Sequence, residues 1–319
     1  MIWNSDRMDY FAADSFSGME RVHPRRWQNF GISKNSGILM KRDPTLDQVA
    51  VIVSGGAGNG PLFQGYVGDG LADAAVVGAT YAAPNAYAIY EAGKYLGRRK
   101  GVLLLYNNFA GDYLNNDMAK ELLEMDGIQV ESVISTDDVA SALGESRDNR
   151  SGGCGIALLI KLAGSCVKLG MSLAETASLL RRANLRLGTL SMHVNFQTSQ
   201  IVFGAGFSGE PGLRTKDLMD IRPAAREAME ILTGDLEPAQ GERLFLLVNR
   251  LRLTSYPDSY IMANAVYDIL SEQYHIEKIR VAAFSNIVDT YGFNFSILCM
   301  DDTMQSLLMD DVSSDSFIL

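Results

Sequence analysis

A glycine-rich turn near residue 55 combines backbone freedom with a position where a strand ends. The turn, Ser54-Gly-Gly-Ala-Gly-Asn-Gly-Pro61, directly follows the apolar, β-branched run Val51–Val53. Glycine allows positive φ and close approach to a ligand, so the N–H groups from Gly55 to Asn59 could converge on one ligand oxygen. A turn of this composition also joins a strand to a helix in proteins where it binds nothing. The stretch by itself leaves both interpretations open.

The turn matches neither of the two familiar nucleotide-binding glycine loops. A Walker-type loop ends in Gly-Lys-Ser/Thr, whereas Gly60 is followed by Pro61 and Leu62. The dinucleotide fingerprint requires a glycine three residues after Gly58, and Pro61 stands there instead. We therefore expect no nucleotide or other cofactor site in this chain.

Asp112 is the first candidate for acid–base chemistry. It follows the continuous apolar run Gly101–Tyr106 and a polar turn that begins at Asn107. Such a run is typical of a strand buried on both faces, and open α/β sheets bind ligands at the carboxyl ends of their strands. A carboxylate there could act as a general base. The alternative is a turn or N-cap aspartate, because the pattern predicts a helix from Asn115.

A second glycine-rich loop, Gly204–Gly212, follows the strand-like stretch Gln200–Phe203. It could converge with the loops at 54–61 and 107–112 on one cleft. His193 lies shortly before this loop and could enter the cleft. A lone histidine also occurs on surfaces or in satisfied cores, so its role stays open.

Alternating strands and helices would position these loops. Residues 1 to about 50 indicate an irregular lead-in with one helix, followed by a strand that ends near Val53. The alternation that follows is typical of an α/β fold with a largely parallel sheet covered by helices. Gly170 would end one helix, and Ser172 with Glu175 forms a capping box for the next. The expected helices are 85–96, 115–125, 156–169, 172–187, 217–233 and 259–274, and the later strands 101–106, 128–135, 244–248, 276–284 and 293–300.

The length of 319 residues suggests two domains. The helical pattern stops between residues 188 and 200, which predicts an N-terminal α/β domain over 1–190 and a C-terminal α/β domain over 191–319. The N-terminal domain would hold the first glycine-rich loops, and the C-terminal domain the segment Gly209-Glu-Pro-Gly212.

Composition narrows the function classes. Apolar residues make up 47% and charged residues 21% of the chain, which is typical of a soluble globular protein. No apolar run approaches the ~20 residues that span a bilayer, and the N-terminus lacks a secretory pattern. Three widely spaced cysteines indicate neither disulfides nor a zinc site. A net charge of −10 argues against nucleic-acid binding. We expect a cytoplasmic protein.

Several motifs after the first loop occur in a recognisable order and spacing. These motifs are Gln64-Gly-Tyr-Val-Gly-Asp-Gly70, Ala83-Pro84, Ile89-Tyr-Glu-Ala92 and Gly111-Asp112. Together they resemble the dihydroxyacetone kinase family, specifically its substrate-binding K subunit or domain. The resemblance covers nearly the whole chain. It implies two α/β domains, a homodimer, and a substrate pocket built from the three loops.

The resemblance also implies site residues and reveals substitutions among them. In the family, the first loop supplies N–H groups and a histidine, the second a lysine and an aspartate that assists phosphoryl transfer, and the third a histidine that adds covalently to the ketone of dihydroxyacetone. Here Asn59, Asn107 and Ser208 replace the first histidine, the lysine and the covalent histidine. Asp112 remains as the catalytic candidate. The implied substrate-binding residues are Gly55, Gly56, Gly58, Asn59, Asn107, Asn108, Gly111, Asp112, Ser208 and Gly209.

Two functions follow from the resemblance. The first is a glycerone-kinase-like phosphotransferase subunit that holds a small keto-sugar or polyol, with the phosphoryl donor on a nucleotide-binding partner subunit. The second is a catalytically inactive paralogue that senses such a ligand and acts as a regulator or coactivator. Whether the chain is an enzyme stays open, because the missing nitrogen nucleophile weakens the first alternative.

Overall fold

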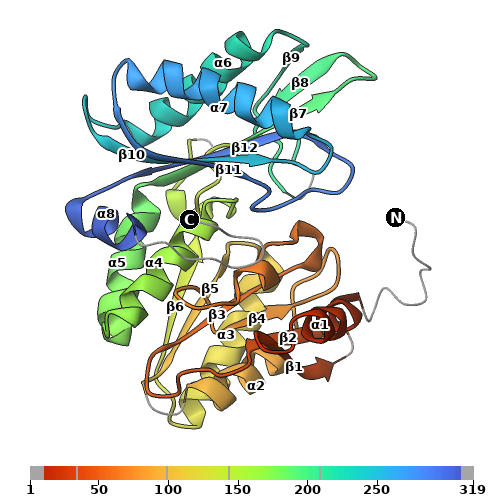
Figure 1. Ribbon diagram of the computed structural model, residues 1–319, viewed down its shortest axis with the longest axis vertical. Coiled ribbons are helices and arrows are strands. Elements are labelled where there is room, and N and C mark those ends of the chain that lie inside the picture. The colour runs from red at the N-terminus through yellow and green to blue at the C-terminus, as the bar shows by residue number, and fades with distance from the viewer. Residues whose placement is uncertain (1–10, 34, 98–99, 143, 208–209, 310–319) are drawn as a thin grey trace. The chain divides into compact units, whose positions relative to one another are not determined.

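The computed structural model describes residues 11–33, 35–97, 100–142, 144–207 and 210–309 (Figure 1). The chain forms two compact units. Unit 1 contains the chain up to Ile134, the segment Leu159–Arg181 and the stretch from Leu307. Unit 2 contains Ser135–Leu158 and Arg182–Ser306. These units do not coincide with a single division at residue 190, and which stretches fold independently stays a prediction.

Unit 1 is built on a six-stranded sheet in the order β1-β2-β4-β3-β5-β6. Strands β3, β4 and β5 are mutually parallel, whereas β1 with β2 and β2 with β4 are antiparallel. The central strands are buried along their whole length, as the apolar runs predict. The strands are β1 (Trp27–Ser33), β2 (Ser36–Lys41), β3 (Ala50–Gly55), β4 (Ala74–Val77), β5 (Val102–Asn107) and β6 (Val130–Ser135).

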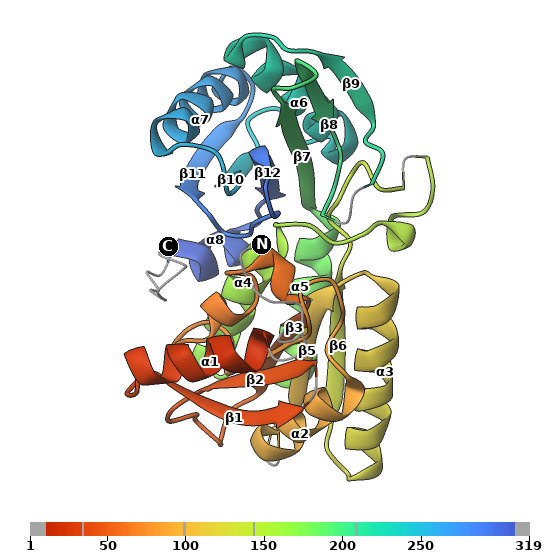
Figure 2. The same cartoon turned by 90° about the vertical axis from the view of Figure 1, so that its right-hand side faces the viewer.

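Helices α2 and α3 cover one face of this sheet (Figure 2). Apolar side chains such as Ile89 and Leu123 pack there against Ile52 and Leu104. The Asn85 side chain caps α2 by accepting a hydrogen bond from the Ala88 N–H at 2.8 Å. The helices with all or most of their residues in unit 1 are α1 (Phe11–Val22), α2 (Ala86–Leu96), α3 (Ala110–Met125), α4 (Ile156–Lys168) and α5 (Leu173–Leu185).

Unit 2 is built on a second six-stranded sheet in the order β11-β10-β12-β7-β8-β9. Only β10 and β11 are parallel, and every other neighbouring pair is antiparallel. Helices α6 and α7 pack on one face through a core that includes Leu232, Val266 and Phe295. The elements are β7 (Leu187–Asn195), β8 (Gln200–Phe203), β9 (Arg214–Asp217), α6 (Ile221–Leu236), β10 (Arg243–Arg250), α7 (Tyr256–Ser271), β11 (His275–Ala282), β12 (Tyr291–Cys299) and α8 (Asp302–Met309).

The predicted α/β class with strand–helix alternation is confirmed, with three corrections. The stretch before residue 50 is not irregular apart from one helix, because it also contains the β1–β2 hairpin. The largely parallel arrangement holds only for the centre of the first sheet. Residues 187–195 form a strand in the middle of the second sheet, which the sequence pattern did not predict. Antiparallel pairing between distant segments leaves no local periodicity of its own.

The predicted helix ends are confirmed where local chemistry specifies them. Ser172 and Glu175 form the reciprocal capping box, with the Ser172 N–H donating to Glu175 Oε2 at 2.9 Å and the Glu175 N–H to Ser172 Oγ at 3.3 Å. Gly170 has φ +78 after α4. None of the described helices is long and apolar enough to cross a membrane.

Candidate functional site

The first glycine-rich turn packs tightly against its own unit. A Cβ on Gly55 would lie 1.9 Å from the Phe63 ring, and a Cβ on Gly58 would lie 2.3 Å from the Thr80 carbonyl oxygen. Both positions therefore exclude a side chain for reasons of packing. A Cβ on Gly56 would have its nearest neighbour at 3.5 Å, an ordinary contact. Gly56 is thus the glycine of this turn that packing does not explain.

Part of the turn's N–H row is occupied by the chain itself. The Ala57 N–H donates to the Ala79 carbonyl at 3.0 Å, and the Gly58 N–H to the Thr80 carbonyl at 2.9 Å. These two groups are not open to a ligand, contrary to the expectation for the whole row from Gly55 to Asn59. The Gly56 N–H makes no hydrogen bond to any described residue. The Gly56 N–H therefore remains open to a ligand.

Asp112 lies in the first turn of α3, which begins at Ala110 rather than at Asn115. The N-cap residue is Phe109, so the alternative of an N-cap aspartate is wrong. The Asp112 side chain is buried, and its Oδ1 atom accepts no hydrogen bond among the described residues. Burial raises the pKa of Asp112 to about 7. A carboxyl group with that pKa can both accept and release a proton near neutral pH.

Asn116 connects Asp112 to the strand that carries the glycine turn. Its Nδ2 donates to the Asp112 backbone carbonyl at 2.8 Å and to Ser54 Oγ at 2.9 Å, and all three residues are buried. The network holds the first turn of α3 against the end of β3. Sequence reasoning missed Asn116 as a site residue. The available signal was an asparagine one helical turn after Asp112. Its buried position follows only when the helix begins at Ala110, which the sequence pattern did not predict.

The loop at 78–84 forms a third side of the candidate site, beside the glycine turn and the start of α3. A Cβ on Gly56 would contact the Ala82 carbonyl oxygen at 3.5 Å, and a Cβ on Gly111 would lie 3.2 Å from Ala83 Cβ. The loops at 54–61, 78–84 and 107–112 therefore meet at the carboxyl ends of β3, β4 and β5. The sequence-predicted residues Gly55, Gly56, Gly58, Asn59, Asn107, Asn108, Gly111 and Asp112 all lie on the first and third of these loops.

Asn107 and Asn108 occupy different environments. Asn107 is buried at the end of β5, and its carbonyl accepts the Phe109 N–H at 2.9 Å. Asn108 is half-buried. Where the family resemblance implied a lysine, the neutral Asn107 amide therefore lies in the interior and adds no positive charge to the site.

The second glycine-rich loop lies in unit 2, directly after β8. The Gly204 N–H donates to the Ser191 carbonyl and the Gly206 N–H to Ser191 Oγ, both at 2.7 Å. Ser208 and Gly209 lie outside the described residues. A cleft shared by this loop and the loops of unit 1 would lie between the two units, and it stays a prediction.

His193 is neutral and lines a hollow of about 730 Å³ in unit 2, together with Phe207, Glu210 and Tyr291. Its Nε2 atom is buried without a hydrogen-bond partner among the described residues. Burial lowers the pKa of His193 to about 4, so the neutral imidazole dominates at pH 7. A neutral imidazole keeps the lone pair that a nucleophile or base needs.

The described residues show neither a metal-binding cluster nor a reactive thiol. No group of three or more histidine, cysteine, aspartate and glutamate side chains there could hold a metal ion. Cys154, Cys166 and Cys299 are free and buried. Burial raises the pKa of each thiol, which disfavours the reactive thiolate.

Comparison with known proteins places this geometry in a family. The Dak1 domain model matches residues 17–316. The PTS-dependent dihydroxyacetone kinase 2, dihydroxyacetone-binding subunit DhaK, from Listeria innocua is 32% identical over 299 residues, which is 89% of each chain. The crystal structure of dihydroxyacetone kinase of C. freundii superposes with a TM-score of 0.90 at 23% identity, covering 100% of this chain and 60% of that one.

A protein with a regulatory description is also similar. The dihydroxyacetone kinase operon co-activator Dha-DhaQ matches with a TM-score of 0.86 at 25% identity, covering 95% of this chain and 97% of that one. The chain is thus similar both to proteins described as kinase subunits and to a protein described as a co-activator. The chain belongs to the Dak1 domain family, the dihydroxyacetone kinase family that its motifs resemble.

Proposed function

We propose that this chain holds a small keto-sugar or polyol at the Asp112 site for phosphoryl transfer from a nucleotide-binding partner subunit. The observation that carries the proposal is the Asp112 Oδ1 atom, which is buried and accepts no hydrogen bond among the described residues. A buried acceptor without a donor costs free energy that a ligand hydroxyl would recover. A second ligand oxygen would bind the open Gly56 N–H, on the glycine turn that meets the 107–112 segment across the loop at 78–84.

The chemistry follows from the pKa of Asp112. Above its pKa of about 7 the ionised carboxylate accepts the proton of the ligand hydroxyl. That hydroxyl oxygen then forms a bond to the transferred phosphorus while the bond between phosphorus and the donor's leaving oxygen breaks. Asn116 maintains the position of the carboxylate relative to the glycine turn through its hydrogen bonds to Asp112 and Ser54.

The proposed binding is noncovalent. In the family, a histidine forms the bond to the ketone, and Ser208 stands at that position here. A serine hydroxyl needs an adjacent base to attack a carbonyl. We expect denaturing mass spectrometry of protein incubated with dihydroxyacetone and borohydride to show no covalent adduct. An adduct of one triose on Ser208 or His193 would contradict this expectation.

A ligand-sensing role is the second candidate. The loss of three family side chains and the similarity to the co-activator favour it. In that role the same Asp112 site binds the same class of ligand, and a regulator replaces the nucleotide-binding subunit as partner. We propose a cytoplasmic homodimer in either role, from the family resemblance. Light scattering that shows only a monomer would contradict the homodimer.

Calorimetric titration tests the binding proposal. We expect dihydroxyacetone or a four-carbon ketose to bind the wild-type protein, and the phosphorylated forms to bind more weakly because Asn107 adds no charge. Asp112→Asn should weaken binding by at least about tenfold, since it removes a charge-assisted acceptor. Absence of binding by trioses, tetroses and their phosphates would contradict both roles.

A coupled assay separates the two roles. Phosphorylation of a bound ketose when a family nucleotide-binding subunit and its phosphoryl donor are added would establish the enzyme. Binding without phosphorylation would favour the sensor. The Asp112→Asn variant is the control for both readings, because it leaves the backbone network through Asn116 in place.

A further inference from the structure

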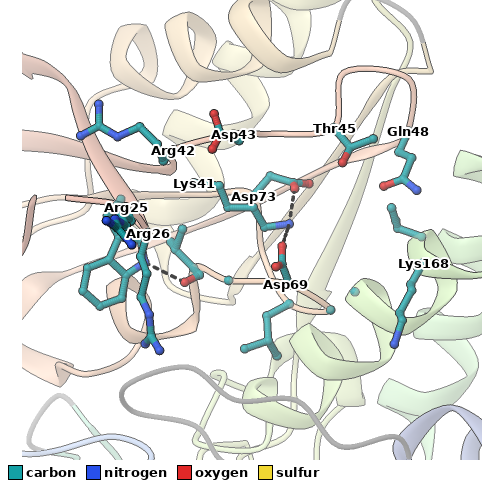
Figure 3. Close-up of a pocket in the computed structure, with 17 residues that line it drawn as sticks. Arg25, Arg26, Lys41, Arg42, Asp43, Thr45, Gln48, Asp69, Asp73 and Lys168 are labelled. Atoms are coloured by element: carbon teal, nitrogen blue, oxygen red, sulfur yellow. Dashed lines mark hydrogen bonds and ion pairs between the residues drawn. The ribbon is translucent and has the colours of Figure 1, made fainter. Parts of the chain in front are cut away.

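Unit 1 contains a hollow at the end of its parallel strands opposite to the candidate site. Its volume is about 680 Å³ (Figure 3). The candidate site lies where β3 ends, at Gly55 and Gly56, whereas this hollow lies where β3 and β4 begin, beside the Val51 N–H and Asp73. The two sites are therefore separated by the length of the strands. We call the second one the basic pocket.

The lining of the basic pocket is mainly polar and cationic. Five of its side chains are basic, Arg25, Arg26, Lys41, Arg42 and Lys168, and three are acidic, Asp43, Asp69 and Asp73. In the whole chain the acidic residues outnumber the basic ones, 38 to 28. The balance of charge in the pocket is thus the reverse of the balance in the chain.

Internal ion pairs account for much of the acidic charge. Lys41 Nζ lies 2.8 Å from Asp73 Oδ1 and 3.7 Å from Asp69 Oδ1. Asp73 also accepts the Val51 N–H at 2.9 Å, so it is held in place and neutralised. Arg25 and Lys168, by contrast, are exposed and make no ion pair or hydrogen bond with a described residue. Their charges are open to a ligand.

Rigid contacts hold the walls of the pocket. A Cβ on Gly164 in α4 would lie 2.1 Å from the Gly70 carbonyl oxygen, so the helix that carries Lys168 packs directly on the floor of the pocket. On the other side Trp27 Nε1 donates to the Val67 carbonyl at 2.9 Å and fixes the segment that follows Arg25. Figure 3 shows Arg25 and Arg26 on one side of Asp69 and Lys168 on the other.

We propose that the basic pocket binds a small ligand that carries phosphate groups. Arg25 and Lys168 would supply charge-assisted hydrogen bonds from two sides, and Thr45 and Gln48 neutral donors. A large polyanion such as a nucleic acid is not expected to bind, because the overall charge of −10 would repel the part of it that lies outside the pocket. The basic pocket shares no lining residue with the Asp112 site.

Calorimetry with inorganic pyrophosphate at constant ionic strength tests the proposal. We expect a Kd of about 1 mM or tighter for the wild-type protein, and at least about tenfold weaker binding for the double variant Arg25→Gln/Lys168→Gln. The matched control is Arg226→Gln/Arg252→Gln, which removes two exposed charges that make no described contact in unit 2. The control should bind as the wild type does.

Three outcomes would overturn the proposal. Pyrophosphate could fail to bind, the control could lose as much affinity as the pocket variant, or citrate could bind as tightly as pyrophosphate. The second result would assign the effect to overall charge, and the third would show that the pocket does not select phosphate over carboxylate. All four substituted side chains are exposed, and thermal melts of both variants would verify that they fold.

Discussion

Two glycine-rich regions of this protein each lie beside a buried aspartate, and the two carboxylates differ in how many hydrogen bonds they accept. In unit 2, Asp137 accepts hydrogen bonds from Ser135 Oγ at 2.6 Å, the Gly153 N–H at 2.7 Å and the Gly155 N–H at 2.9 Å. Thr189 Oγ1 donates to it as well, at 2.5 Å. In unit 1, Asp112 Oδ1 has no donor among the described residues.

The difference shows what separates a structural glycine motif from a candidate site. Around Asp137 the glycines are needed because a Cβ on Gly153 or Gly155 would lie 2.9 or 2.6 Å from its carboxylate. Their N–H groups are consumed by the same carboxylate. At Gly56 a side chain would fit, and its N–H makes no hydrogen bond to a described residue, just as Asp112 Oδ1 accepts none. Unused hydrogen-bonding groups, rather than glycine content, indicate where a ligand belongs.

The largest expected effect is the loss of the saturated carboxylate. Asp137→Ala should lower the free energy of unfolding by about 3–5 kcal/mol, because it leaves several buried donors without an acceptor. Urea denaturation at pH 7 measures this. A loss below about 1 kcal/mol would show that water replaces the carboxylate, and would remove the contrast with Asp112.

Asp112→Asn, by contrast, should stabilise the protein at high pH. The folded pKa of Asp112, about 7, exceeds its unfolded value near 3.9, so its stabilising contribution is complete below pH ~4 and is lost as pH rises through 7. The asparagine variant avoids the cost of ionising a buried carboxyl. Relative to wild type, its free energy of unfolding should rise by about 2–4 kcal/mol between pH 4 and pH 8.

Denaturation series at both pH values test this prediction. The pKa of Asp138, also raised to about 7, and mainly by burial, affects wild type and variant alike and cancels in the difference. A constant difference across this pH range would mean that Asp112 ionises as an exposed carboxyl does, and would contradict its role as a base poised near neutrality.

The smallest effects come from a matched pair of glycines in one turn. Gly58→Ala should destabilise the protein by about 1–3 kcal/mol, because its Cβ would meet the Thr80 carbonyl oxygen at 2.3 Å. Gly56→Ala should change the free energy of unfolding by less than about 0.5 kcal/mol, since its Cβ has room. Equal losses in thermal melts would show that packing alone explains both glycines.

Local patterns sufficed for much of the fold. The apolar run at 101–106 predicted a buried strand, and Gly170 and the Ser172–Glu175 box predicted helix ends, because each signal lies within a few residues of its effect. The β1–β2 hairpin, β7 and the antiparallel second sheet were not predicted. β7 is stabilised by a partner far away in the sequence, as its Thr189 pairs with Ser296 on β12.

The amino-acid sequence by itself determined the family, the glycine turn and Asp112 as the position of interest, since motif order and residue type are written in the chain. Only the tertiary structure decided which groups remain available. It assigned the Ala57 and Gly58 N–H groups to the 78–84 loop and placed Asn116 between Ser54 and Asp112. Hydrogen-bond satisfaction and burial depend on segments that meet only after folding, so neither can be read from a motif.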